Sequence, residues 1–191
     1  MRTIPARFAS MIPLVFAVAL VLQQQAAQQP ATATAAGDSA RSATRQAITD
    51  VGRGVAETRS THELLRRAVF NGTDAQVVER AQQMQQRCRE LVTIVQSATG
   101  RICRSCYAAV AQRAINVYRT GLPSVGQVGT RCVNQLTQDL RARNAAAAVR
   151  ASIRIIGQAL AGGLQPYEAR LLEVRRAFGL VAPPSAPARR R

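Results

Sequence analysis

The residues best suited to chemistry in this sequence are its four cysteines, Cys88, Cys103, Cys106 and Cys132. Even numbers of cysteines in small exported proteins usually form disulfides. Cys103 and Cys106 also have the C-x-x-C spacing of a thioredoxin-like redox pair or of half a zinc site. The redox motif needs a strand-helix-strand fold and the zinc site a second short spacing, and the sequence shows neither. We therefore predict two structural disulfides, no bound metal and no cofactor.

The pairing of these cysteines is open, because four cysteines allow three connectivities. A bond between Cys103 and Cys106 would join residues three apart on one helix, which is strained unless the turn there is irregular. We therefore favour a bond from Cys88 to one member of the pair and from Cys132 to the other. This arrangement would tie three successive helices together.

Arginine is the second residue type that suggests a function. All 26 basic residues are arginines, and the formal net charge is +16. The densest cluster comprises Arg141, Arg143, Arg150 and Arg154, of which the last three are seven and four residues apart and share one side of a helix. Such a patch predicts binding to polyanions or to an anionic membrane surface. The same cluster would also arise as a solvated face that keeps the protein soluble, or from a coding bias toward arginine and alanine.

The sequence has few candidate catalytic residues and few aromatic residues that could recognise nucleic-acid bases. His62 is the only histidine, and it shares a helical face with Val55, Leu65 and Val69, which is more typical of packing than of catalysis. The ten acidic residues are scattered, and no phosphate-binding glycine loop is found. There is no tryptophan, and three tyrosines and four phenylalanines offer few stacking partners for bases. We therefore predict neither an enzyme nor a sequence-specific nucleic-acid binder.

The first 27 residues indicate export. Two arginines followed by an apolar run from Met11 to Leu22 are typical of a secretory signal peptide, which we assign to residues 1–27. The alternative is a mitochondrial presequence.

Residues 28–38 are predicted to be a flexible linker, and residues 181–191, which are rich in proline and arginine, are predicted to be a disordered tail. Asn71-Gly72-Thr73 is an N-glycosylation sequon, so Asn71 would carry a glycan if the chain is secreted in a eukaryote.

Residues 39–180 carry the apolar spacing of helices and no strand pattern. We expect helix ends near Thr99-Gly100, at Gly121-Leu122-Pro123 and at Gly162-Gly163, with a last helix from Pro166. Thr73 and Gln76 have the spacing of a capping box that would begin the second helix. The prediction is an all-α, disulfide-linked bundle of about five helices.

Two functions fit these features. The first is a secreted, extracellular helical protein that binds a protein partner or a small apolar ligand, without catalysis. The second is an extracellular binder of polyanions, glycosaminoglycans or anionic membranes that uses its surface arginines.

Overall fold

The computed structural model describes residues 12–178. This part of the chain forms four helices, α1 (Ile12–Asn71), α2 (Asp74–Arg101), α3 (Ala109–Arg141) and α4 (Ala145–Ala177), and contains no strand. The all-α class is confirmed, with four helices in place of about five. No helix among the described residues is long and apolar enough to cross a membrane.

The chain divides into two compact units, Met1–Ser39 and Ala40–Arg191. The described part of the first unit is helical and belongs to α1. Residues 28–38 therefore lie in a helix, where the sequence predicts a flexible linker; their alanines and glutamine have high helix propensity. The predicted signal peptide lies only partly in the described region, and the predicted tail at 181–191 lies outside it.

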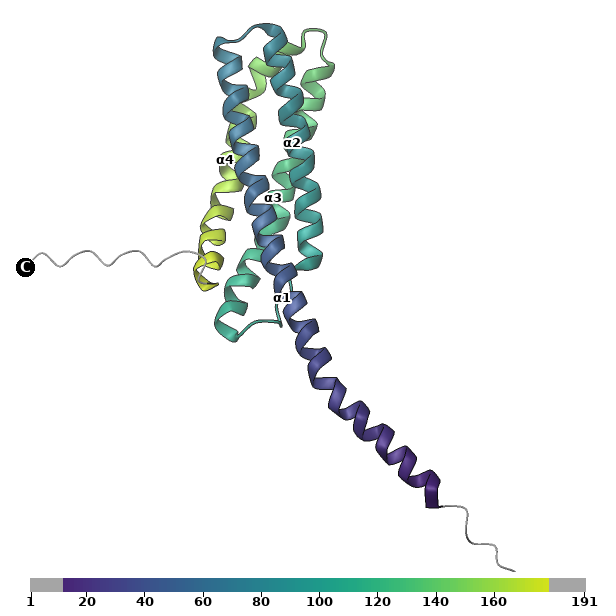
Figure 1. Ribbon diagram of the computed structural model, residues 1–191. Helices are drawn as coiled ribbons and strands as arrows, with labels where there is room; N and C mark the ends of the chain where they lie inside the picture. Colours follow the sequence, from purple (N-terminus) through teal and green to yellow (C-terminus); the bar gives the residue numbers. More distant parts are fainter. Residues whose placement is uncertain (1–11, 179–191) are drawn as a thin grey trace, which may run out of the picture. The chain divides into compact units, whose positions relative to one another are not determined.

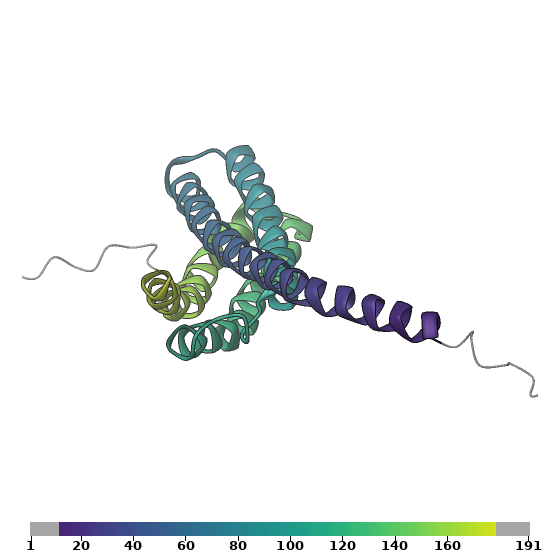
Figure 2. The same ribbon diagram turned by 60° about the horizontal axis from the view of Figure 1, so that its bottom comes forward.

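The second unit is a bundle of α2, α3, α4 and the part of α1 that follows Ala40 (Figures 1 and 2). The connections 72–73 and 142–144 are short, so α1 and α2 are antiparallel, as are α3 and α4. Figure 1 shows both connections at the same end of the bundle. The α2–α3 loop, residues 102–108, lies at the other end, where the rings of Tyr107 and Phe178 are 4.9 Å apart between centroids.

The buried faces of α1 and α2 follow the predicted spacing. On α2, apolar residues at alternating spacings of four and three are all buried: Val77, Ala81, Met84, Cys88, Leu91, Val95 and Ala98. On α1, the buried face includes Val55 and Leu65, as predicted, together with Ile48, Val51 and Thr58. The capping box that begins α2 is also confirmed, since Gln76 N–H donates to Thr73 Oγ1 and Thr73 N–H donates to Gln76 Oε1.

Two predicted helix ends are wrong. α3 continues through Pro123, and α4 continues through Gly162-Gly163. Pro123 lies on the exposed side of α3, where water can satisfy the carbonyl that loses its partner, while Leu122 and Val125 are fully buried next to it. The helix instead ends at Arg141, and the side chain of Asn144 caps α4 by accepting from Ala147 N–H at 3.0 Å.

The predicted disulfide pairing is also wrong. The two bridges join Cys88 to Cys132, and Cys103 to Cys106. The sequence predicts a helix from Arg101 onward, but residues 102–108 form an irregular loop, so Cys103 and Cys106 meet within a turn. The first bridge ties α2 to α3 inside the core. Since all four cysteines are in disulfides, they are not zinc ligands.

Two polar contacts lie inside the bundle. The hydroxyls of Tyr118 on α3 and Tyr167 on α4 are hydrogen-bonded at 2.5 Å, and both side chains are buried. Burial raises the pKa of Tyr118 to about 12 and also raises the pKa of Tyr167. Asp139 on α3 accepts a hydrogen bond from Ser152 on α4. Both contacts join α3 to α4.

Candidate functional site

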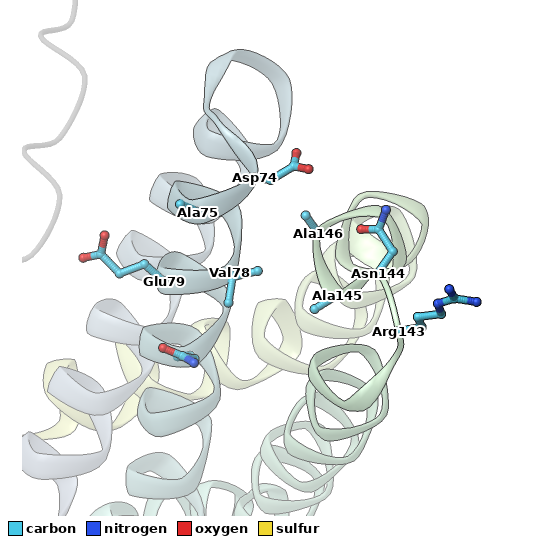
Figure 3. Close-up of a pocket in the computed structure, with 9 residues that line it drawn as sticks. Asp74, Ala75, Val78, Glu79, Arg143, Asn144, Ala145 and Ala146 are labelled. Carbon is cyan, nitrogen blue, oxygen red and sulfur yellow. The ribbon is translucent and has the colours of Figure 1, made fainter.

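The four predicted polyanion-binding arginines lie at or near the α3–α4 connection. Arg141 ends α3, Arg143 lies in the connection, and Arg150 and Arg154 lie on α4. Arg141, Arg143 and Arg154 are exposed, and Figure 3 shows the Arg143 side chain directed away from α2. The structure thus brings three of these four side chains to the surface.

Arg150 differs from the other three because its donors face inward. Its Nη1 lies 2.5 Å from Asp74 Oδ1, and its Nη2 and Nε donate to the carbonyls of Gly72 at 3.3 Å and Val69 at 3.4 Å. These contacts satisfy carbonyls at the end of α1 and fix the α1–α2 turn onto α4. Arg150 therefore positions the turn.

The outer surface of α3 carries cations without exposed carboxylates. Its only acidic residue, Asp139, is 5 % exposed and accepts from Ser152 Oγ and, at 3.0 Å, from Gln135 Nε2. The arginines of α3 are all exposed: Arg113, Arg119, Arg131 and Arg141. Within residues 12–178, no carboxylate lies within ion-pair distance of any of them. We call these four residues and Arg143 the α3 arginine face.

The ion pairs between helices are found elsewhere on the bundle. They join α1 to α4 through Arg59 and Glu168 at 3.0 Å, and α1 to α2 through Glu57 and Arg87 at 3.3 Å. The carboxylates therefore gather on α1, α2 and the second half of α4. From Leu91 to Tyr167 the sequence has nine arginines and only one acid, Asp139. This asymmetry is visible in the sequence and points to Arg113, Arg119 and Arg131. The spacing of arginines in the sequence did not identify these three residues because they are far apart along the chain.

A groove of about 390 Å³ runs between α3 and α4 on this surface. Arg131, Gln135 and Gln138 contribute its polar side, and Ile155 and Ala159 contribute apolar surface. Ile155 is 56 % exposed, which is high for an isoleucine. The groove contains one charged residue, Arg131, so an approaching anion meets attraction and no repulsion from the lining.

A larger hollow of about 750 Å³ lies at the end of the bundle between α2 and the α3–α4 connection (Figure 3). Its lining includes Asp74 and Glu79 as well as Arg143 and Asn144. The two helix starts beside it are already capped by Thr73 and Asn144. With carboxylates in its wall, this hollow is a weaker place for an anion than the α3 arginine face.

His62 is packed against α4, as its position among apolar residues predicted. A Cβ added at Gly157 would lie 3.2 Å from His62 Cε1, so the absence of a side chain there makes room for the ring. Burial lowers the pKa of His62 below its ordinary value of 6.5. Its Nε2 is buried and has no hydrogen-bond partner within the described part of the chain.

Asn71 is the last residue of α1 and is exposed. The hydroxyl of Thr73, the third residue of the sequon, is part of the capping box of α2. A glycan on Asn71 would extend from the bundle end that holds both short connections. Among residues 12–178, no three His, Cys, Asp or Glu side chains gather as a metal site.

Compared with known proteins, the chain matches no family model, no curated protein and no solved structure.

Proposed function

We propose that this protein is a secreted helical protein that binds an extended polyanion, such as a sulfated glycosaminoglycan, through the α3 arginine face. The observation that carries the proposal is the exposed side of α3, a helix of 33 residues on which the single acid is buried. At 1.5 Å rise per residue, such a helix is roughly 50 Å long, which suits a linear ligand.

The internal use of Asp139 supports this proposal. Its carboxylate is buried and hydrogen-bonded by Ser152 and Gln135, so it is not a surface ion-pair partner for Arg131 or Arg141. A surface of one sign attracts polyanions at long range, and attraction falls as salt rises. Few aromatic residues are available for stacking on bases, so the protein would recognise the charge of a polyanion and not a base sequence.

Secretion is part of the same proposal. The two disulfides indicate an oxidising, extracellular-type environment. Removal of residues 1–27 with Arg2 and Arg7 would lower the formal charge from +16 to +14, since 16 − 2 = 14. The intact mass of the naturally produced protein, before and after reduction, would reveal a cleaved signal peptide, two bridges and any glycan on Asn71.

The test of the binding site compares two triple variants with equal charge. The first is Arg131→Gln/Arg141→Gln/Arg143→Gln on the α3 arginine face. The second, the control, is Arg45→Gln/Arg89→Gln/Arg176→Gln; these arginines are also exposed but lie on α1, α2 and α4. Both variants lose three charges from the surface of the protein.

Affinity for a heparin oligosaccharide should be measured as a function of salt. Each lost contact to the polyanion should lower the slope of log K against log salt by about one, as for phosphates of duplex DNA. We expect the α3 variant to lose roughly three units of slope and the control less than one. Equal losses in both variants, or weak binding of the unmodified protein at low salt, would refute the proposed site.

A protein partner is the second candidate, because Ile155 offers exposed apolar surface in the groove between α3 and α4. An acidic partner would suit Arg131 beside it. If the α3 variant keeps its heparin affinity while Ile155→Asn abolishes capture of an acidic partner, this second function would replace the first.

A further inference from the structure

The two disulfides of this protein lie in very different surroundings. Cys88 and Cys132 are 0 % and 3 % exposed and join α2 to α3 inside the core. Cys103 and Cys106 are only partly buried, in the loop between these helices, with Arg104 and Ser105 exposed between them. Reagents in solution therefore reach the second bridge without any opening of the bundle.

The loop backbone is anchored at both cysteines by contacts that do not involve sulfur. Cys103 N–H donates to Thr44 Oγ1 at 2.9 Å, and Arg41 Nε donates to the carbonyl of Cys106 at 2.8 Å. The hydroxyl of Tyr107 donates to the carbonyl of Arg41 at 2.9 Å. The Cα atoms of Cys103 and Cys106 are 5.6 Å apart in the closed bridge, and the anchored backbone would keep two thiols near each other after its reduction.

A cation within this loop favours the approach of an external thiolate. Arg104 is exposed between the two cysteines, whereas the guanidinium of Arg101, at the end of α2, is paired with Asp50 at 3.3 Å. α3 begins at Ala109, and its N-cap residue Ala108 makes no side-chain hydrogen bond to the first turn. A nearby cation and the start of a helix both attract an attacking thiolate, which carries negative charge. Residues 12–178 lack the strand-helix-strand fold of thioredoxin-like proteins, so the proposed exchange rests on the exposure of the bridge and on these charges and not on that fold.

We propose that Cys103–Cys106 is a thiol–disulfide exchange site that reacts reversibly with low-molecular-weight thiols of the glutathione class. The thiolate of one such thiol attacks the sulfur of Cys103, and a mixed disulfide forms as the bond to Cys106 breaks. The sulfur of Cys106 leaves as a thiolate and takes a proton from water.

A second thiolate then attacks the external sulfur of the mixed disulfide and releases the external disulfide, which leaves both cysteines reduced. Two electrons pass from two external thiols to the bridge, and an external disulfide reverses the sequence. The anchoring by Thr44 and Arg41 keeps the helices in place during this cycle, so the buried bridge is not affected.

The test uses the full oxidised chain in glutathione buffers of graded redox poise, with acid quench, alkylation and peptide mass spectrometry. We expect Cys103 and Cys106 to be reduced about a hundredfold faster than Cys88 and Cys132, because the buried bridge requires local opening. The far-UV circular dichroism should stay unchanged when only the exposed bridge is reduced. Oxidised glutathione should re-form the Cys103–Cys106 bridge.

Two variants separate exchange from simple lability. Cys106→Ser should trap glutathione on Cys103 as a stable mixed disulfide, and Arg104→Gln should slow the first attack several-fold, since the attacking thiolate carries negative charge. The proposal is overturned if both bridges are reduced at the same rate, if reduction of the exposed bridge unfolds the bundle, or if Cys106→Ser takes up no glutathione.

Discussion

Gly162 and Gly163 are adjacent in α4 and have opposite surroundings. A Cβ at Gly162 would meet no atom within 4 Å, whereas a Cβ at Gly163 would overlap Cγ2 of Val128 on α3 and lie 3.2 Å from its Cβ. Both glycines have helical backbone, since α4 continues to Ala177. The pair therefore offers two alanine substitutions that differ only in packing.

The two effects can be worked out separately. Gly162→Ala should raise the free energy of unfolding by about 1 kcal/mol, the difference between glycine and alanine in a helix interior. Gly163→Ala gains the same term, but the added methyl overpacks the contact with α3 at a cost of about 1–3 kcal/mol. Val128 is β-branched and 6 % exposed, so it has little freedom to rotate away. Gly163→Ala should thus be less stable than Gly162→Ala by about 1–3 kcal/mol.

Urea unfolding followed by far-UV circular dichroism, with both bridges intact, measures this difference. Adding Val128→Ala to Gly163→Ala should recover part of the overpacking loss, since the two side chains touch. If Gly162→Ala destabilises the protein, the helix ends at Gly162 with a glycine cap and α4 is not continuous. If both alanine variants have the same stability, α3 and α4 do not approach at Gly163.

Three further predictions concern the core. Cys88→Ala/Cys132→Ala should lower the free energy of unfolding by about 4 kcal/mol in denaturant titrations, because this bridge has a sequence separation of 44 and restricts the unfolded chain. Burial lowers the pKa of His62, so the unfolded chain takes up the proton first as the pH falls through 6.5. Stability should therefore fall as the pH drops from 7 toward the lower native pKa, and His62→Gln should flatten the part of the pH profile just below pH 6.5. Tyr118→Phe should cost about 1–3 kcal/mol by leaving the Tyr167 hydroxyl without its partner, while the Tyr118→Phe/Tyr167→Phe double variant should cost less than the sum in a double-mutant cycle.

The faces of the helices were accessible from the sequence because burial follows periodicity. Val77 to Ala98 on α2 shows this, as does the capping box of Thr73 and Gln76. The helix ends were harder to predict from the sequence. Glycine and proline affect only the local backbone, whereas packing between helices can keep a helix continuous through them. Pro123 predicts a helix end, but the burial of its neighbour Leu122 against the core keeps α3 continuous.

The same limit applies to the disulfides. The sequence identifies the cysteines but places Cys103 and Cys106 on a helix, where a bond between them is strained. No local signal announces the irregular loop at residues 102–108, which depends on anchoring by Thr44 and Arg41 from a distant part of the chain. The sequence therefore predicts which cysteines form disulfides, but the spacing of the cysteines does not predict how they pair.

Arg150 illustrates the corresponding limit for the site. Its spacing from Arg143 and Arg154 suggests one cationic patch, but its donors satisfy carbonyls near the α1–α2 turn and the carboxylate of Asp74. Neighbours along a helix share a side, yet their partners come from other helices, and these cannot be read from spacing. A substitution at Arg150 would therefore report on stability and not on ligand binding, which is why it is left out of the α3 variant.

The placement of the arginines separates charges used in folding from charges that are free to act outside. The ion pairs between helices within residues 12–178 join α1, α2 and α4, and none involves α3. Exposed ion pairs contribute about 0–1 kcal/mol each, so the bundle gains little from these pairs. The arginines of α3 make no ion pair among the described residues, so their neutralisation should not destabilise the fold. Solubility requires net charge but not a helix surface free of exposed carboxylates, whereas α3 combines both, which suits a linear polyanion.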